Sequence, residues 1–111
     1  MNAKKSVEIN SMCTVFAESE IIGLLSKGRS REEIVRGAVE AVSKRVAAMA
    51  GKVGVEGKTV FTGGVAKNAA MVKTLEKDLK TKLIVPEEPR ITGALGAALI
   101  AAKKSRMDKN I

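Results

Sequence analysis

The 111-residue sequence has no histidine, tryptophan or tyrosine, two phenylalanines and a single cysteine. The lack of histidine excludes histidine-based acid–base catalysis and zinc sites built on imidazole. One cysteine excludes a disulfide within the chain and is typical of a protein in the reducing cytoplasm, which is the location we expect. The shortage of aromatic side chains removes the stacking platforms on which single-stranded nucleic acids are usually bound.

Long apolar runs are missing too. No stretch of about 18 apolar residues predicts a membrane span, and the first ten residues lack the apolar core of a signal peptide. The net charge is +8, from 20 Lys and Arg against 12 Asp and Glu. Such a balance suits nucleic acid, but over residues 73–80 the lysines are mixed with acidic residues, as on a solvated helix face. A small basic nucleic-acid-binding domain therefore remains an alternative.

The stretch around which the chain is organised is KTVFTGGVAKNAAM, residues 58–71. Residues 59–62 favour a short strand, the pair Gly63 and Gly64 ends it, and a helical pattern follows. Glycines lack a Cβ, so a ligand can lie directly against the backbone, and the next helix offers free N–H groups. The combination suits a phosphate, or the ribose and base beside it. Asn68, in the first turn, can either bond a ligand or brace the loop.

A structural interpretation of the same stretch stays open. A glycine pair between a strand and a helix is ordinary loop chemistry in α/β domains. Neither the Walker pattern nor GxGxxG is present, so a phosphate-loop or dinucleotide fold is not indicated.

The remaining pattern alternates helices and strands, which predicts a parallel sheet in a single α/β domain. We expect an ordered core over residues 5–104 and a frayed tail over 105–111. Residues 6–12 are expected to be extended and to form a third strand beside 59–62 and 82–85. Gly28 should end a first helix, and Ser30 and Glu33 should form a capping box that opens a second helix running to about Ala50. Thr92 is expected to cap the last helix, which starts at Gly93. The apolar stripe of the second helix comprises Val35, Val39, Val42, Val46 and Met49.

Three segments carry a resemblance to a known family: MCTVFAESE (12–20), TGGVAKNAAMV (62–72) and GALGAALIA (93–101). They resemble, in the same order, the activators of 2-hydroxyacyl-CoA dehydratases and the ATPase subunits of benzoyl-CoA reductase, the BadF/BadG/BcrA/BcrD ATPase family. The resemblance implies the second half of a two-lobe, actin-like (ribonuclease H-like) ATPase. It further implies ATP or ADP with Mg²⁺, a homodimer that shares one [4Fe–4S] cluster, and electron transfer to a dehydratase or acyl-CoA reductase.

The resemblance also implies roles for individual residues. Cys13 matches a cluster ligand, although from the residues alone a buried inert thiol is equally open. Gly63 and Gly64 match the glycines against the adenosine and the α-phosphate, and Thr62 and Asn68 belong to the same motif. On the second helix, Glu33 or Arg36 is a candidate for the adenine pocket.

The resemblance assigns no catalytic residue to this chain. The γ-phosphate apparatus and the other cluster cysteine of the family lie in the N-terminal lobe, which this chain lacks. We therefore expect neither ATP hydrolysis nor a cluster in this chain alone. The rival interpretation is a non-catalytic α/β interaction module.

Overall fold

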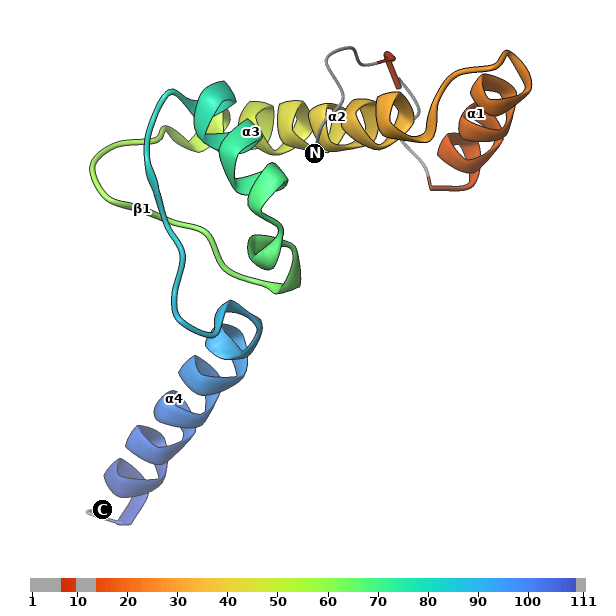
Figure 1. Cartoon of the computed structure of the whole chain (residues 1–111). Helices are drawn as coiled ribbons and strands as arrows, with labels where there is room; N and C mark the ends of the chain where they lie inside the picture. Colours follow the sequence, from red (N-terminus) through yellow and green to blue (C-terminus); the bar gives the residue numbers. More distant parts are fainter. Residues whose placement is uncertain (1–6, 10–13, 110–111) are drawn as a thin grey trace.

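The computed structural model describes residues 7–9 and 14–109, and its long helix α2 forms the axis of the molecule (Figure 1). Helix α1 lies at one end of α2, α3 packs across the middle of α2, and α4 points away from the body. In chain order the elements are α1 (Thr14–Ser26), α2 (Arg31–Val53), β1 (Thr59–Val60), the 3₁₀ turn η1 (Gly64–Lys67), α3 (Ala69–Leu79), β2 (Leu83–Ile84), the 3₁₀ turn η2 (Pro89–Ile91) and α4 (Thr92–Lys109).

The turn between α1 and α2 forms as the sequence predicts. Gly28 has φ +81°, and it donates to the Leu25 carbonyl at 3.0 Å while Arg29 donates to the Leu24 carbonyl at 3.1 Å. This pair of hydrogen bonds is a Schellman motif, which requires the left-handed backbone that glycine adopts freely. The Ser30 hydroxyl then accepts from the Glu33 N–H at 3.2 Å, so α2 begins at the predicted cap.

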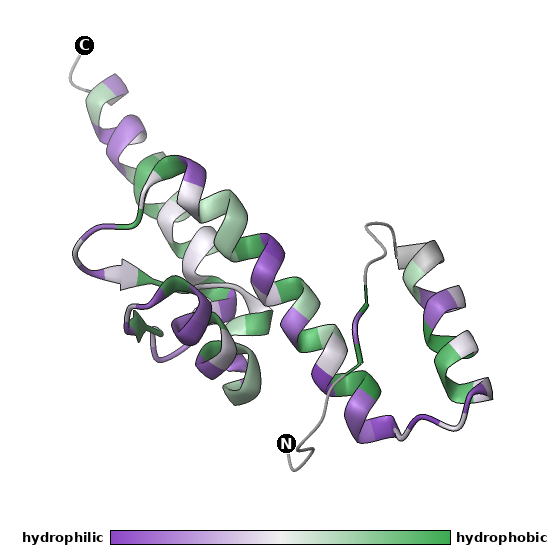
Figure 2. Ribbon diagram, turned by 90° about the horizontal axis from the view of Figure 1, so that it is seen from above, coloured by the Kyte–Doolittle hydropathy of each residue, from purple (hydrophilic) through white to green (hydrophobic). Residues whose placement is uncertain are grey.

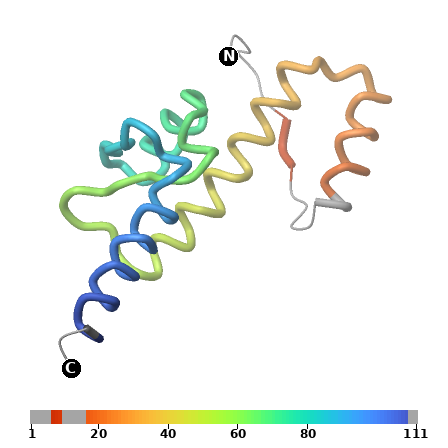
Figure 3. The backbone as a smooth tube through the Cα atoms, turned by 90° about the horizontal axis from the view of Figure 1, so that it is seen from below, coloured from red at the N-terminus to blue at the C-terminus, as the bar shows by residue number. Residues whose placement is uncertain are grey.

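A small apolar core joins the described N-terminal residues to α1 and α2. Val7, Ile9 and Ile34 are buried together, with Ile21 and Leu24 of α1 packed against them. Figure 3 shows the segment 7–9 running beside α2. No strand is assigned to residues 7–9, so this part of the expected third strand lies on a helix and not in the sheet. The rest of that expected strand lies outside the described residues.

The sheet consists of two parallel strands, β1 and β2, paired through Thr59 with Leu83 and Val60 with Ile84. A further hydrogen bond, from the Phe61 N–H to the Ile84 carbonyl at 2.9 Å, extends the pairing towards Gly63 and Gly64, which we call the glycine loop. The parallel strand–helix–strand arrangement is the one predicted, although both strands are shorter than the expected ranges.

The face that α2 turns towards α3 differs from the apolar stripe predicted for it. Ser43, which lies off that stripe, is 0% exposed and donates to Asp78 Oδ2 at 2.6 Å. On the α3 side Met71 and Leu75 are buried. Three of the five stripe residues are exposed: Val35, Val42 and Met49. These three stripe residues therefore lie outside the core of the described chain, and the contact between α2 and α3 includes the polar pair Ser43–Asp78.

Helix α4 projects from the body and contacts the rest of the described chain chiefly through η2. Its large apolar residues Leu95, Leu99 and Ile100 are exposed, and green segments mark the apolar positions of α2 and α4 in Figure 2. The radius of gyration is 18.5 Å, against about 13 Å for a compact domain of this length. α4 remains helical to Lys109, beyond the expected start of the tail at residue 105.

None of the helices in the described part of the chain is long and apolar enough to cross a bilayer.

Candidate functional site

The glycine loop lies at the carboxyl end of β1, where open parallel sheets bind their ligands. Gly63 has φ +95°, a conformation strained for any residue with a side chain. Both Gly63 and Gly64 are exposed, and a Cβ built on either would meet no atom within 4 Å. Thr62, just before them, is also exposed. The loop therefore offers open backbone that a ligand can approach from solvent.

The hydrogen bonds of the loop determine which of its groups face a ligand. The Gly63 N–H donates to the Pro89 carbonyl at 2.8 Å, so that donor is used internally. Gly64 and Val65 begin η1, and the first amides of a helix have no acceptor within it. The amide donors that the loop can offer to an anion are therefore those of Gly64 and Val65 rather than that of Gly63.

Asn68 braces the loop, one of the two roles predicted for it. Its Oδ1 accepts from the Met71 N–H at 3.1 Å and so caps α3. Because the carbonyl oxygen is used, Nδ2 is the atom of this side chain that can meet a ligand.

A groove of about 540 Å³ runs between α2 and α3 and reaches the first residues of α3. Arg36 and Glu40 form its α2 wall and are joined by an ion pair, Nε to Oε1 at 3.1 Å; Ala69 and Ala70 form the end nearest the glycine loop. The volume lies within the range of about 300–1,000 Å³ typical of small-molecule sites. The other residues lining the groove are polar or charged: Lys44, Lys73, Thr74, Lys77 and Asp78.

Of the two adenine-pocket candidates on α2, the structure brings Arg36 to this groove. Glu33 is not among the described residues that line it. Instead the Glu33 backbone bonds the Ser30 cap, and its Oε2 lies 3.7 Å from Arg29 Nη1. That distance makes an ion pair but is too long for a hydrogen bond, so Oε2 has no hydrogen-bond partner in the described part of the chain.

Cys13 lies outside the described residues, so its role stays a prediction. In the chain it directly precedes Thr14, the first residue of α1. Within residues 7–9 and 14–109, no group of three His, Cys, Asp or Glu side chains is placed to hold a metal ion.

Two residues whose contacts with the glycine motif were not predicted from the sequence are Glu88 and Pro89. Pro89 is buried and its carbonyl accepts from Gly63, while Lys67 Nζ lies 3.2 Å from Glu88 Oε2. Both residues lie far along the chain from the glycine loop, so no local pattern predicts the contact. Only Pro89, as a turn residue before the last helix, gave a local signal of any kind.

Two parallel strands flanked by helices, with a glycine loop at their carboxyl edge, define the chain as an α/β domain. The model of the BadF/BadG/BcrA/BcrD ATPase family matches residues 1–101. The 2-hydroxyisocaproyl-CoA dehydratase activator of Clostridioides difficile is 46% identical over 115 aligned positions, covering 100% of this chain and 43% of the relative. The activator of lactoyl-CoA dehydratase of Anaerotignum propionicum is 50% identical over 99, covering 89% of this chain and 38% of the relative.

The structural comparison agrees. The solved activator of the 2-hydroxyisocaproyl-CoA dehydratase from Clostridium difficile, with bound ADPNP, superimposes with a TM-score of 0.84 at 42% identity, covering 98% of this chain and 41% of that one. The chain belongs to the BadF/BadG/BcrA/BcrD ATPase family and has its actin-like α/β fold. It spans less than half the length of these relatives.

Proposed function

We propose that the chain is the C-terminal nucleotide-binding lobe of an ATP-dependent activator that passes an electron to a 2-hydroxyacyl-CoA dehydratase or a related acyl-CoA reductase. The observation that carries the proposal is the exposed Gly63–Gly64 backbone at the carboxyl end of β1, open to a ligand on its outer side. The 46% identical relative is named a 2-hydroxyisocaproyl-CoA dehydratase activator, and the 42% identical solved structure holds ADPNP.

In this proposal the nucleotide lies across the glycine loop with its base towards the α2–α3 groove. The amides of Gly64 and Val65 face the α-phosphate, because as the first amides of η1 they have no acceptor within the turn. Thr62 and Asn68 Nδ2 border the ribose, and Arg36 borders the base. Mg²⁺ and the γ-phosphate contacts come from the N-terminal lobe of such an activator.

The iron–sulfur part of the proposal rests on Cys13. A cysteine just before a helix is favoured as a thiolate, the form that ligates iron. A [4Fe–4S] cluster takes four thiolates, and this chain has one cysteine. The cluster therefore fits only an assembly of several chains. We propose that this assembly is a cytoplasmic homodimer of the activator, in which the N-terminal lobe of each subunit supplies one further cysteine.

The exposed apolar residues fit the same assembly. Leu95 and Leu99 of α4 are 54% and 63% exposed, and Val42 and Met49 of α2 are exposed as well. Because large apolar side chains exposed along one helix are typical of an interaction surface, we propose that the N-terminal lobe covers α4. An interaction module without nucleotide remains the alternative.

The test is calorimetric titration of the chain with MgADP, comparing Gly64→Ala with Gly51→Ala. Both glycines have open space around the added methyl group and neither has a positive φ, so both variants should fold. We expect Gly64→Ala to weaken ADP binding about tenfold, a loss of about 1.4 kcal/mol, and Gly51→Ala to bind like the wild type. Equal affinity in the two variants, or no binding by the wild type, would make the loop structural.

A further inference from the structure

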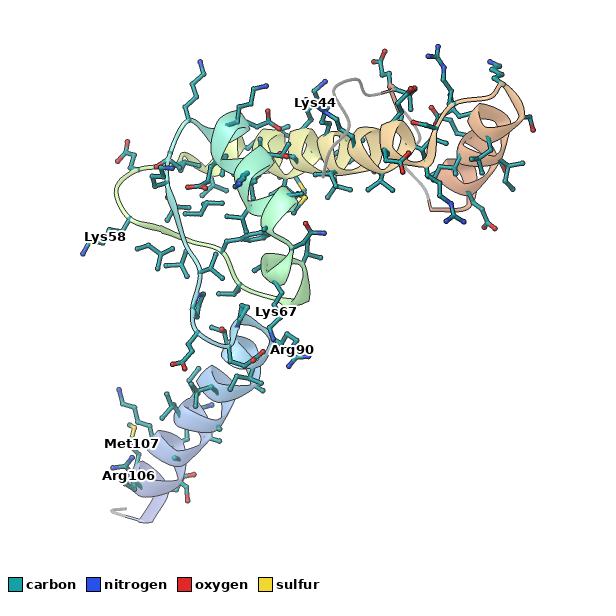
Figure 4. All side chains as sticks on the ribbon, in the orientation of Figure 1. Lys44, Lys58, Lys67, Arg90, Arg106 and Met107 are labelled. Atoms are coloured by element: carbon teal, nitrogen blue, oxygen red, sulfur yellow. The ribbon has the colours of Figure 1, made fainter. Side chains whose placement is uncertain are left out.

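The segment between β2 and α4 is fastened to the glycine loop at three points. The Pro89 carbonyl accepts from the Gly63 N–H at 2.8 Å, and Glu88 Oε2 pairs with Lys67 Nζ at 3.2 Å. The third point is apolar, since Ala66 of η1 and Pro89 of η2 are both buried and the two turns are in contact. Lys67 and Arg90 lie near each other where the body meets α4 (Figure 4).

Glu88 is the acidic residue of this junction, and each of its two carboxylate oxygens pairs with a different cation. Its Oε1 accepts from Arg90 Nε at 2.7 Å, while Oε2 pairs with Lys67. Hydrogen bonds from Arg90 first, and then from Lys67, lower the pKa of the Glu88 carboxyl from its ordinary value. The group is therefore an anion at neutral pH, shared between a cation of η1 and a cation of η2.

We propose that Glu88 is a positioning residue for the nucleotide: by holding Lys67 it fixes η1, and so aims the Gly64 and Val65 amides at the phosphate. The inference rests on the proposed nucleotide site and adds a residue to it. Glu88 does not touch the ligand in this arrangement. Its effect passes through Lys67 and through the adjacent Pro89 carbonyl, which holds Gly63 at the start of the same turn.

The size of the effect follows from exposure. The Lys67 and Glu88 side chains are 45% and 37% exposed, so the pair is partly screened by water and salt. Loss of the pair should therefore weaken ADP binding by a modest factor, about three- to fivefold at low salt, and the difference should shrink at high salt.

The experiment compares Glu88→Gln with Glu87→Gln, which removes the same charge at an exposed neighbour. Lys67→Met and the Lys67→Met/Glu88→Gln double variant complete a cycle. MgADP affinity is measured for the whole chain at low and high salt, and amide hydrogen exchange of Gly63 is measured without nucleotide. The Val72 amide, which donates to Asn68 O at 3.0 Å within α3, is the internal reference.

We expect Glu88→Gln to weaken binding about three- to fivefold and to speed Gly63 exchange by a similar factor. Val72 exchange and the Glu87→Gln variant should be unchanged, and the double variant should be no worse than Lys67→Met. Additive losses in the double variant, or tighter binding by Glu88→Gln, would overturn the proposal, the latter by showing that Glu88 competes with the nucleotide for Lys67.

The two possible failures are distinguishable. A wild-type chain that binds no ADP contradicts the nucleotide site itself, while Gly63 exchange still measures the Glu88 contact. Exchange unaffected by Glu88→Gln would then exclude the positioning role as well.

Discussion

Gly37 is the residue at which the segment 7–9 crosses α2. A Cβ at this position would collide with the Val7 carbonyl oxygen, so only glycine lets the two backbones come so close. We predict that Gly37→Ala displaces residues 7–9 and destabilises the fold by about 1–3 kcal/mol, as overpacking does in other cores.

Gly51→Ala, in the same helix, is the control. Its added methyl group meets no atom within 4 Å, so it should be neutral or stabilising by up to about 1 kcal/mol. Chemical denaturation measures both variants. A Gly37→Ala protein as stable as Gly51→Ala would show that residues 7–9 do not rest on α2 in solution.

At the residue scale, the sequence predicts those features, such as caps and turns, that depend on one residue and its neighbours in the chain. Gly28, Ser30 and the open glycine pair were predicted because a missing Cβ or a capping hydroxyl acts locally. The bond from Ser43 to Asp78 was not predicted, because it joins residues 35 positions apart and no periodicity marks it. The Lys67–Glu88 pair was missed for the same reason.

At the scale of one element, Asn68 caps helix α3 and, in our proposal, also borders the nucleotide. A pair of substitutions can separate these two roles. Asn68→Ala removes the cap on the Met71 N–H and should cost about 1 kcal/mol of stability. Asn68→Asp keeps the capping oxygen and adds a negative charge that the helix dipole favours, so its stability should equal or exceed that of the wild type.

Nucleotide binding should respond differently from stability in this pair. The carboxylate that Asn68→Asp introduces would repel a phosphate on the neighbouring loop, so we predict weaker MgADP binding by a stable protein. Thermal unfolding and ADP titration together measure the two effects. An Asn68→Asp protein that is stable and binds ADP normally would place the phosphate away from α3.

Elements were predicted more reliably than their burial. Helix and strand order follows from apolar spacing, glycines and caps, which are local signals. Burial depends on what covers each face, and in α2 the exposed Val42 lies next to the fully buried Ser43. This chain spans less than half the length of its relatives. In our proposal an N-terminal lobe covers part of its surface, so an apolar face can mark either the chain's own core or the contact with that lobe.

At the scale of the whole molecule, the chain should bind a nucleotide without hydrolysing it. Phosphoryl transfer needs Mg²⁺, donors around the γ-phosphate and a positioned water. In our proposal the loop offers donors to the α-phosphate and the ribose, and none to the γ-phosphate. We predict no metal-dependent phosphate release from ATP by the purified chain; release abolished by Gly64→Val would show that the γ-phosphate groups are present after all.

The separate positions of α1 and α3 on α2 lead to a last prediction about an assembled activator, because α1 packs against Ile34 at the start of α2 and α3 meets Ser43 near its middle. Cys13 precedes α1, whereas the glycine loop precedes α3, so cluster and nucleotide should be separable by mutation. In a protein that joins this chain to the N-terminal lobe of such an activator, Cys13→Ala removes one thiolate per subunit, or two of the four in a homodimer. We expect it to abolish iron–sulfur absorbance and electron transfer while ATP binding largely survives.

The reciprocal control is Gly64→Ala, which should lose nucleotide affinity and keep the cluster. Anaerobic reconstitution followed by iron and sulfide analysis measures the cluster in both variants, and ADP titration measures the nucleotide site. The chain by itself, with one thiol, should purify colourless. A Cys13→Ala activator that holds a full, redox-active cluster would remove Cys13 from the iron site and leave it a structural thiol at the start of α1.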